Sequence, residues 1–444
     1  MSEAADLGVV EAAGLLGRRE LSSRELVEAC LARIRERDSA VGAWVRVYEE
    51  SALADAGRAD RARARGDAPF LCGVPIALKD LYAVAGKPLT ASSRVLDVVP
   101  RRSCEAWVRL HRQGMVLLGH VHTHEFAAGG TTDQVGNPWA LERSPGGSSG
   151  GSAAALASRT VPAATGTDTA GSLRIPSAFC GTSTIKPTRG LVPLGGIVPL
   201  ARTLDHAGPM ARTVRDCGPL LAALTRLRVD STQSPARPPR RVVVSPRVGE
   251  LDPDVADGFD AAVAALGASL VAVAPPEVAL DLGTAPLDLL CAEMLAWHRR
   301  FNARRHHYRA STRGFLEHAE RRNLTAAERA SIQRRRRRDT ARWRDWFAEH
   351  RVDALLEPTV PIVARPRGKG YDAPFADLAE VSLTHYWDWT GLPVVALPSG
   401  VGRRSGLPTG VSLIGPPGSE QELLAAGAAL QDELGLPSPP AYGR

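Results

Sequence analysis

Long apolar runs and targeting signals are missing from this 444-residue chain, and both absences narrow the class of protein. No segment reaches about 18 uninterrupted apolar residues, the length that a membrane-spanning helix needs. The first residues, Met1 to Asp6, are acidic and lack the basic and then apolar order of a secretory signal. We therefore expect a cytoplasmic protein without a membrane partner.

Cysteine is also sparse, with six residues and no paired metal-ligand spacing, at Cys30, Cys72, Cys104, Cys180, Cys217 and Cys291. Scattered thiols in a chain of this length are typical of small core residues in a reducing compartment. Candidate metal ligands gather in one region, at Glu293, His298, His306, His307 and Tyr308. Because they contain no His-x-x-x-His pair with a carboxylate, we interpret them as surface or pocket-wall residues. The sequence predicts no metal and no cofactor.

The composition is that of a soluble globular protein, with 44% hydrophobic and 23% charged residues. The formal charge of +7 comes mostly from arginine, including the run Arg334 to Arg338. That run lies in a predicted helix, residues 325–349, whose apolar stripe includes Trp343 and Phe347. We interpret the arginines as a solvated helix face, with binding of RNA or another polyanion as the alternative.

The most informative segment is the run of serine and glycine from Ser144 to Ser152, which precedes an Ala/Leu-rich helical pattern. Alone it would be read as a linker or tight turn. Two other segments favour a catalytic function for this run over a linker or turn. The apolar run 72–81 predicts a buried strand that carries Lys79, and lysine is rarely buried without a function. The small residues of 166–177 form a turn whose backbone N–H groups can converge on an oxyanion.

Together, Lys79, Ser148 and Ser172 resemble the Ser-cisSer-Lys triad of the amidase signature family. The resemblance extends over most of the chain, through Thr123–Ala127, Asn137–Trp139, Ser177–Gly181, Lys186–Gly190, Asp205–Met210, Thr390–Pro393 and Gly406–Gly410. It implies an α/β fold, with a single large mixed, mostly parallel β-sheet covered by helices on both faces. It also implies one domain over residues 1–444, with the catalytic motifs in about 70–210 and a divergent, mainly helical region in about 260–350.

The resemblance assigns a role to each residue of the triad. Ser172 is the nucleophile, Ser148 relays its proton, and Lys79 is the base, neutral because burial lowers a lysine pKa. The Gly147–Ser148 peptide is expected to be cis. Ser149 is interpreted as a helix cap.

The turn that carries the nucleophile is expected to bind the oxyanion. The backbone N–H groups of Thr169, Ala170, Gly171 and Ser172 form the predicted oxyanion hole. Alanine stands at position 170 where many members have glycine, which the turn tolerates if that position needs no positive φ. Asp168 and Arg174 are expected to form an ion pair that holds the turn.

Three functions are compatible with these residues. The favoured one is a free-standing amidase that cleaves the C–N bond of a small linear carboxamide, with no nucleic-acid partner; a homodimer is left open. The alternative is the glutaminase subunit of a tRNA-dependent amidotransferase, but residues 291–298 lack the Asn-Leu-Ala-Arg-Phe-Asp-Gly pattern of that subunit. A catalytically silent binding protein is the third, and the retained triad argues against it.

Overall fold

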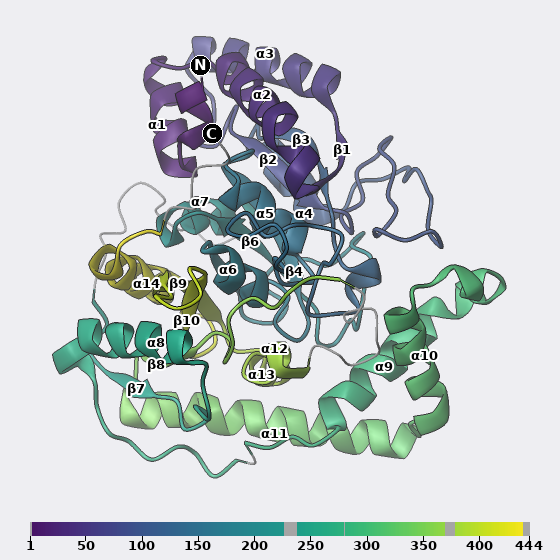
Figure 1. Ribbon diagram of the computed structural model, residues 1–444, viewed down its shortest axis with the longest axis vertical. Helices are drawn as coiled ribbons and strands as arrows, with labels where there is room; N and C mark the ends of the chain where they lie inside the picture. Colours follow the sequence, from purple (N-terminus) through teal and green to yellow (C-terminus); the bar gives the residue numbers. More distant parts are fainter. Residues whose placement is uncertain (1, 226–237, 279, 369–377, 438–444) are drawn as a thin grey trace.

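The strands of this computed structural model, which describes residues 2–225, 238–278, 280–368 and 378–437, form one ten-stranded sheet (Figure 1). Its order is β1-β3-β2-β4-β6-β5-β9-β10-β8-β7. The strands are β1 (Trp44–Val47), β2 (Pro75–Lys79), β3 (Val116–Val121), β4 (Ala163–Asp168), β5 (Ser183–Lys186), β6 (His206–Ala211), β7 (Val242–Val244), β8 (Ala354–Pro358), β9 (Val394–Val401) and β10 (Pro408–Ile414).

The single mixed sheet is confirmed, but its predicted parallel majority is wrong. Only β2–β3, β2–β4 and β7–β8 are parallel, and the other six neighbouring pairs are antiparallel. One reason is visible in β9 and β10, which are joined by residues 402–407 alone. So short a connection returns the chain antiparallel, because a parallel crossover needs about a dozen residues or more.

Helices cover both faces of the sheet. Helices α5 and α6 pack on each other and on the sheet, and α7 and α14 form a second such pair. The helices are α1 (Val9–Arg18), α2 (Ser23–Val41), α3 (Glu49–Arg65), α4 (Glu105–Arg112), α5 (Gly150–Ala157), α6 (Arg174–Cys180), α7 (Val214–Leu224), α8 (Pro253–Leu266), α9 (Ala285–His298), α10 (Ala310–Arg322), α11 (Ala326–His350), α12 (Leu378–Val381), α13 (His385–Thr390) and α14 (Glu420–Leu434). Short 3₁₀ helices are η1 (Ser2–Asp6), η2 (Glu125–Ala127), η3 (Gly267–Ser269) and η4 (Arg299–His307).

Strand β2 lies between β3 and β4 and is parallel to both. All five of its residues are buried, including Lys79 at its carboxyl end. Since Ile76 and Ala77 pair with Ala163 and Ala164, the end of β2 lies beside the end of β4. The carboxyl ends of neighbouring parallel strands share one edge, where sites in such sheets are usually built.

The predicted arginine-rich helix is α11, which Figure 1 shows as a long helix along one side of the molecule. Its Trp343 and Phe347 are buried and belong to an apolar cluster with Tyr386 and Trp387 of α13. The indole N–H of Trp343 donates a hydrogen bond to Tyr386 Oη at 2.9 Å. Helix α11 therefore packs against α13 and holds it in place.

The solvated-face interpretation of the arginine run is only partly right. Arg334, Arg337 and Arg338 are exposed. Arg336 is buried, with its Nε donating to the Trp389 carbonyl at 2.8 Å. A run of five residues covers more than a full helical turn, so one member faces the core.

The six cysteines are free and buried, which confirms their interpretation as core residues. In the described ranges, no helix combines the length and the apolar character that a membrane crossing requires.

Gly119 in β3 provides a test of the packing beside β2. A methyl group at this position would overlap the carbonyl oxygen of Arg46 in β1, because β1 and β3 are paired there. We expect Gly119→Ala to lower the free energy of unfolding by about 1–3 kcal/mol, the usual cost of overpacking. Urea denaturation measures this change in the free energy of unfolding. Gly218→Ala in α7, where a methyl group meets no atom within 4 Å, is the control and should be neutral or stabilising; equal losses for both would contradict the packing argument.

Candidate active site

Lys79 Nζ lies at the centre of three hydroxyl groups. It is 2.7 Å from Ser148 Oγ, 2.9 Å from Ser149 Oγ and 2.8 Å from Thr167 Oγ1. Lys79 ends β2, Thr167 is near the end of β4, and the two serines precede α5. The structure thus brings Lys79 and Ser148 together as the sequence predicts, and the predicted cis peptide at Gly147–Ser148 is present.

The lysine is completely buried, as are the hydroxyl-bearing side chains of Ser148 and Ser149. Burial disfavours the charged ammonium and lowers the pKa of Lys79 to about 7, although the carboxylates of Asp168 and Asp205 act in the opposite direction. An amine with this pKa is about half neutral at pH 7, so it can accept a proton.

Ser172 lies on the turn 169–172 between β4 and α6, here called the nucleophile turn. The side chain of Ser172 is 6% exposed and lines a cavity. Its carbonyl accepts a hydrogen bond from the N–H of Ser149 at 3.3 Å. This contact places Ser172 against the segment that carries Ser148, although no hydrogen bond joins the two hydroxyl groups.

The predicted oxyanion hole requires a correction at Gly171. The Gly171 N–H donates to Asp168 Oδ1 at 2.6 Å, so it is not available to a substrate. Thr169, Ala170 and Ser172 line the cavity and Gly171 does not, which leaves their three N–H groups as candidates. Gly171 has φ +133°, a conformation that favours glycine, whereas Ala170 has no positive φ. The departure from glycine at position 170 is therefore tolerated.

The expected ion pair between Asp168 and Arg174 is present. Arg174 Nε and Nη2 lie 2.8 and 3.0 Å from the two carboxylate oxygens, and both side chains are buried. Asp168 also accepts the N–H groups of Gly171 and Leu173. One carboxylate thus joins the end of β4, the nucleophile turn and the start of α6.

The interpretation of Ser149 as a helix cap is wrong. Ser149 occupies the N-cap position of α5, but its side chain makes no capping hydrogen bond. Its hydroxyl instead donates to the Thr167 carbonyl at 3.3 Å and accepts from Lys79. Ser149 thus links Lys79 at the end of β2 to the Thr167 carbonyl of β4.

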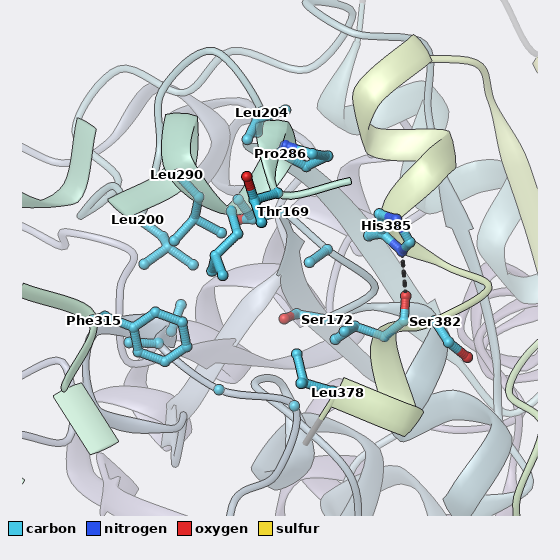
Figure 2. A pocket seen from close by; sticks show the side chains of 18 of the residues that line it. Thr169, Ser172, Leu200, Leu204, Pro286, Leu290, Phe315, Leu378, Ser382 and His385 are labelled. Carbon is cyan, nitrogen blue, oxygen red and sulfur yellow. Dashed lines mark hydrogen bonds between the residues drawn. The ribbon is translucent and has the colours of Figure 1, made fainter. Parts of the chain in front are cut away.

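The cavity beside Ser172 has a volume of about 480 Å³ and a mostly apolar wall. In Figure 2, Leu200, Leu290 and Phe315 lie on one side of the opening, and Ser382 and His385 lie on the other. Asp281 is the one carboxylate among the described lining residues. Burial lowers the pKa of His385, which favours its neutral form. The cavity can hold an acyl group whose carbonyl reaches Ser172.

The five residues considered as metal ligands do not converge. His298 is buried and is hydrogen-bonded through Nδ1 to Tyr308 Oη at 2.6 Å, among aromatic rings that include Phe126. The interpretation as surface or pocket-wall residues is therefore wrong for His298 and Tyr308, whereas His306 and His307 are exposed. The Glu293 carboxylate accepts from Thr203. Within the described ranges, no group of three or more His, Cys, Asp and Glu side chains could hold a metal ion.

Two residues of the site lack an assignment from sequence. Thr167 binds Lys79, and Asp205 accepts a hydrogen bond from Thr169 Oγ1 at 2.6 Å. Alternation along β4, which places Thr165 and Thr167 on one face, is a signal that could have identified Thr167. Asp205 is distant in sequence from the turn it contacts, and only the fold brings the two together.

Comparisons with known proteins agree with this geometry. The family model described as Amidase matches residues 25–424. The A subunit of glutamyl-tRNA(Gln) amidotransferase from Anaeromyxobacter sp. (strain K) is 35% identical, with 98% of each chain covered. A solved structure described as an amidase has a TM-score of 0.85 and 30% identity, covering 97% of this chain and 100% of the other. The corresponding amidotransferase protein of Thermotoga maritima has a TM-score of 0.78 and 26% identity, covering 99% of both chains.

These comparisons contradict one expectation from the sequence. A partner set limited to a small amide, without nucleic acid, conflicts with relatives that are named as subunits of an enzyme acting on glutamyl-tRNA(Gln). The absence of the Asn-Leu-Ala-Arg-Phe-Asp-Gly pattern concerns one short segment, whereas the similarity extends along the whole chain. The family model and the identities together show that this chain belongs to the amidase signature family.

Proposed function

We propose that this chain hydrolyses a carboxamide C–N bond through an acyl-enzyme on Ser172, and that it does so as the amide-hydrolysing subunit of a tRNA-dependent amidotransferase. The observation that carries the chemistry is the buried Lys79 with three hydroxyl neighbours. The observation that supports the role is the 35% identity to an amidotransferase relative over 98% of both chains.

The three hydroxyl groups around Lys79 determine which hydrogen bonds its neutral amine donates and accepts. A neutral amine has two N–H donors and one lone pair. Ser149 donates to the Thr167 carbonyl, so its oxygen accepts from Lys79. If Thr167 accepts the second N–H, the lone pair faces Ser148 at 2.7 Å. Lys79 is then arranged to take a proton from Ser148 and from no other group.

Acylation follows from this arrangement. Ser172 Oγ attacks the amide carbon while its proton passes to Ser148 Oγ, and the proton of Ser148 passes to Lys79. The N–H groups of Thr169, Ala170 and Ser172 stabilise the oxyanion. Lys79 returns the proton through Ser148 to the departing nitrogen, which leaves as ammonia. Water then attacks the acyl-enzyme by the same relay, and the carboxylic acid is released.

Substitutions in the triad should have unequal effects. Ser172→Ala removes the nucleophile, so no acyl-enzyme forms and the loss of turnover should be the largest. Lys79→Ala and Ser148→Ala should each lower kcat by roughly 10²–10⁴, the usual value of general acid–base catalysis. The double variant should be little worse than either, because the two act as one relay. Rates of ammonia release measure this series; near-normal turnover by Lys79→Ala would contradict the relay.

The pH dependence should report the Lys79 pKa. Activity is expected to rise with pH around 7, as the lysine loses its proton. Because the Asp205 carboxylate raises the pKa of Lys79, Asp205→Asn should move this midpoint to lower pH. Asp281→Asn, in the wall of the cavity, is the control and should leave the midpoint in place. A profile of kcat/KM against pH for the three proteins measures the shift, and an Asp205→Asn midpoint at unchanged or higher pH is incompatible with the assignment.

The amidotransferase role needs its own experiment. The tagged chain, purified from its source cells with its bound partners, should release ammonia from glutamine and convert glutamyl-tRNA(Gln) into glutaminyl-tRNA(Gln). The Ser172→Ala complex is the control and should lose the glutamine-dependent reaction. Turnover of apolar carboxamides by the chain alone, without any turnover of glutamine, would overturn this role and leave the Ser172 chemistry intact.

A further inference from the structure

The nucleophile turn is held from outside by residues more than 200 positions later in the chain. Thr384, which precedes α13, donates its Oγ1–H to the Ala170 carbonyl at 2.5 Å. Arg174 donates from Nη1 to the Thr384 carbonyl at 3.0 Å and from Nη2 to Asp388 Oδ2 at 2.5 Å. Thr384 and Asp388 are buried and are not in the wall of the cavity beside Ser172.

These contacts act on one peptide group. The peptide between Ala170 and Gly171 has its carbonyl bound by Thr384 and its N–H bound by Asp168. With both ends bound, the peptide plane cannot rotate without breaking a buried hydrogen bond. The neighbouring peptides, which carry the N–H groups of Ala170 and Ser172, are therefore restrained as well.

The Asp168 end of this arrangement depends on Asp388. Arg174 orients the Asp168 carboxylate through two hydrogen bonds, and Asp388 accepts a hydrogen bond from Nη2 of the same guanidinium. Planar guanidinium groups bonded to carboxylates in this way have a defined orientation. Asp388 thus acts on the turn through Arg174 and then Asp168.

The segment that carries Thr384 and Asp388 is itself packed in the core. Tyr386 and Trp387, between Thr384 and Asp388, are fully buried against Trp343 of α11. A methyl group at Gly171 would overlap Thr384 Oγ1, so the turn and Thr384 are in direct contact. The Thr384 hydroxyl is consequently fixed in space by a packed element.

We infer that Thr384 and Asp388 are positioning residues for the oxyanion hole and the nucleophile. They touch no reacting atom; Thr384 acts through the Ala170 carbonyl, and Asp388 acts through Arg174. The inference rests on the proposed acyl-enzyme chemistry at Ser172 and concerns the rate of acylation, whatever amide is the substrate.

The test compares three threonine variants. Thr384→Val keeps the shape and removes the donor, Thr384→Ser keeps the donor, and Thr390→Val changes a buried threonine of α13 whose hydroxyl bonds only within its own helix. Thr384→Val is expected to lower kcat by about tenfold at unchanged KM, because it leaves the Ala170 carbonyl unsatisfied. Thr384→Ser and Thr390→Val should stay within about twofold of the parent enzyme.

A second readout does not depend on the substrate. The rate at which a small alkyl fluorophosphonate labels Ser172 should fall in parallel with kcat in Thr384→Val, since the phosphonyl oxygen uses the same N–H groups. Asp388→Asn, which removes the charge and keeps the volume, should lower labelling and kcat without changing KM. Thermal unfolding of each variant shows whether the fold is intact.

The outcomes are distinguishable. Normal labelling and kcat in Thr384→Val would overturn the inference, and so would equal losses in Thr384→Val and Thr390→Val with a lowered Tm. Ser172→Ala, measured in parallel, distinguishes a failure of the proposed function from a failure of the positioning role. If that variant remains active, the proposed function itself fails; if it is inactive while Thr384→Val is normal, only the positioning role fails.

Discussion

The site depends on a lysine buried without a carboxylate bonded to its ammonium. Lys79 Nζ is bonded to three hydroxyl groups, and burial lowers its pKa to about 7. A direct carboxylate partner would hold the proton on the amine and remove its ability to act as a base. The nearest influential carboxylates, Asp168 and Asp205, are each committed to the nucleophile turn. The same acids therefore stabilise the turn and moderate the pKa of the base.

A second constraint is the rigidity of the turn that carries Ser172. Oxyanion stabilisation is effective when the donors are fixed before the charge develops, because no reorganisation is then needed. Asp168 binds the turn from β4, Asp205 from the start of β6, and Thr384 from the segment before α13. The adjacent strand and two segments distant in sequence thus converge on four residues.

The cavity and the comparisons describe different properties of the protein. The wall of the cavity near Ser172 is mostly apolar, with Asp281 the single carboxylate among the described lining residues. The relatives that are similar along the whole chain include A subunits of glutamyl-tRNA(Gln) amidotransferase. The two are compatible at the level of the reaction, since the chemistry at Ser172 requires only an amide carbonyl within reach of the turn. The wall of the cavity combines residues of the catalytic core, such as Leu200 and Leu204, with residues of later helices, such as Leu290 and Phe315.

Much of the site could be predicted from the sequence, because its residues lie in short motifs with local consequences. The run 144–152, the lysine at the end of an apolar strand and the small-residue turn 166–177 are local patterns, and their resemblance to the amidase signature family identified Lys79, Ser148 and Ser172. The Asp168–Arg174 pair was expected from the two charges that flank the same turn. The start of the predicted helix 325–349 is also local, and Thr325 is the N-cap residue of α11.

What only the tertiary structure decided are contacts between segments distant in sequence. The bonding of Ser149 to Lys79 and the contacts of Asp205 and Thr384 depend on strand order and on packing. The same holds for the antiparallel majority of the sheet, which follows from how the strands are connected. The bond from the Gly171 N–H to Asp168 is local in sequence, but it depends on the conformation that the turn adopts. A motif specifies which groups are present, whereas the direction of each hydrogen bond is determined by whichever neighbour the fold places within about 3 Å.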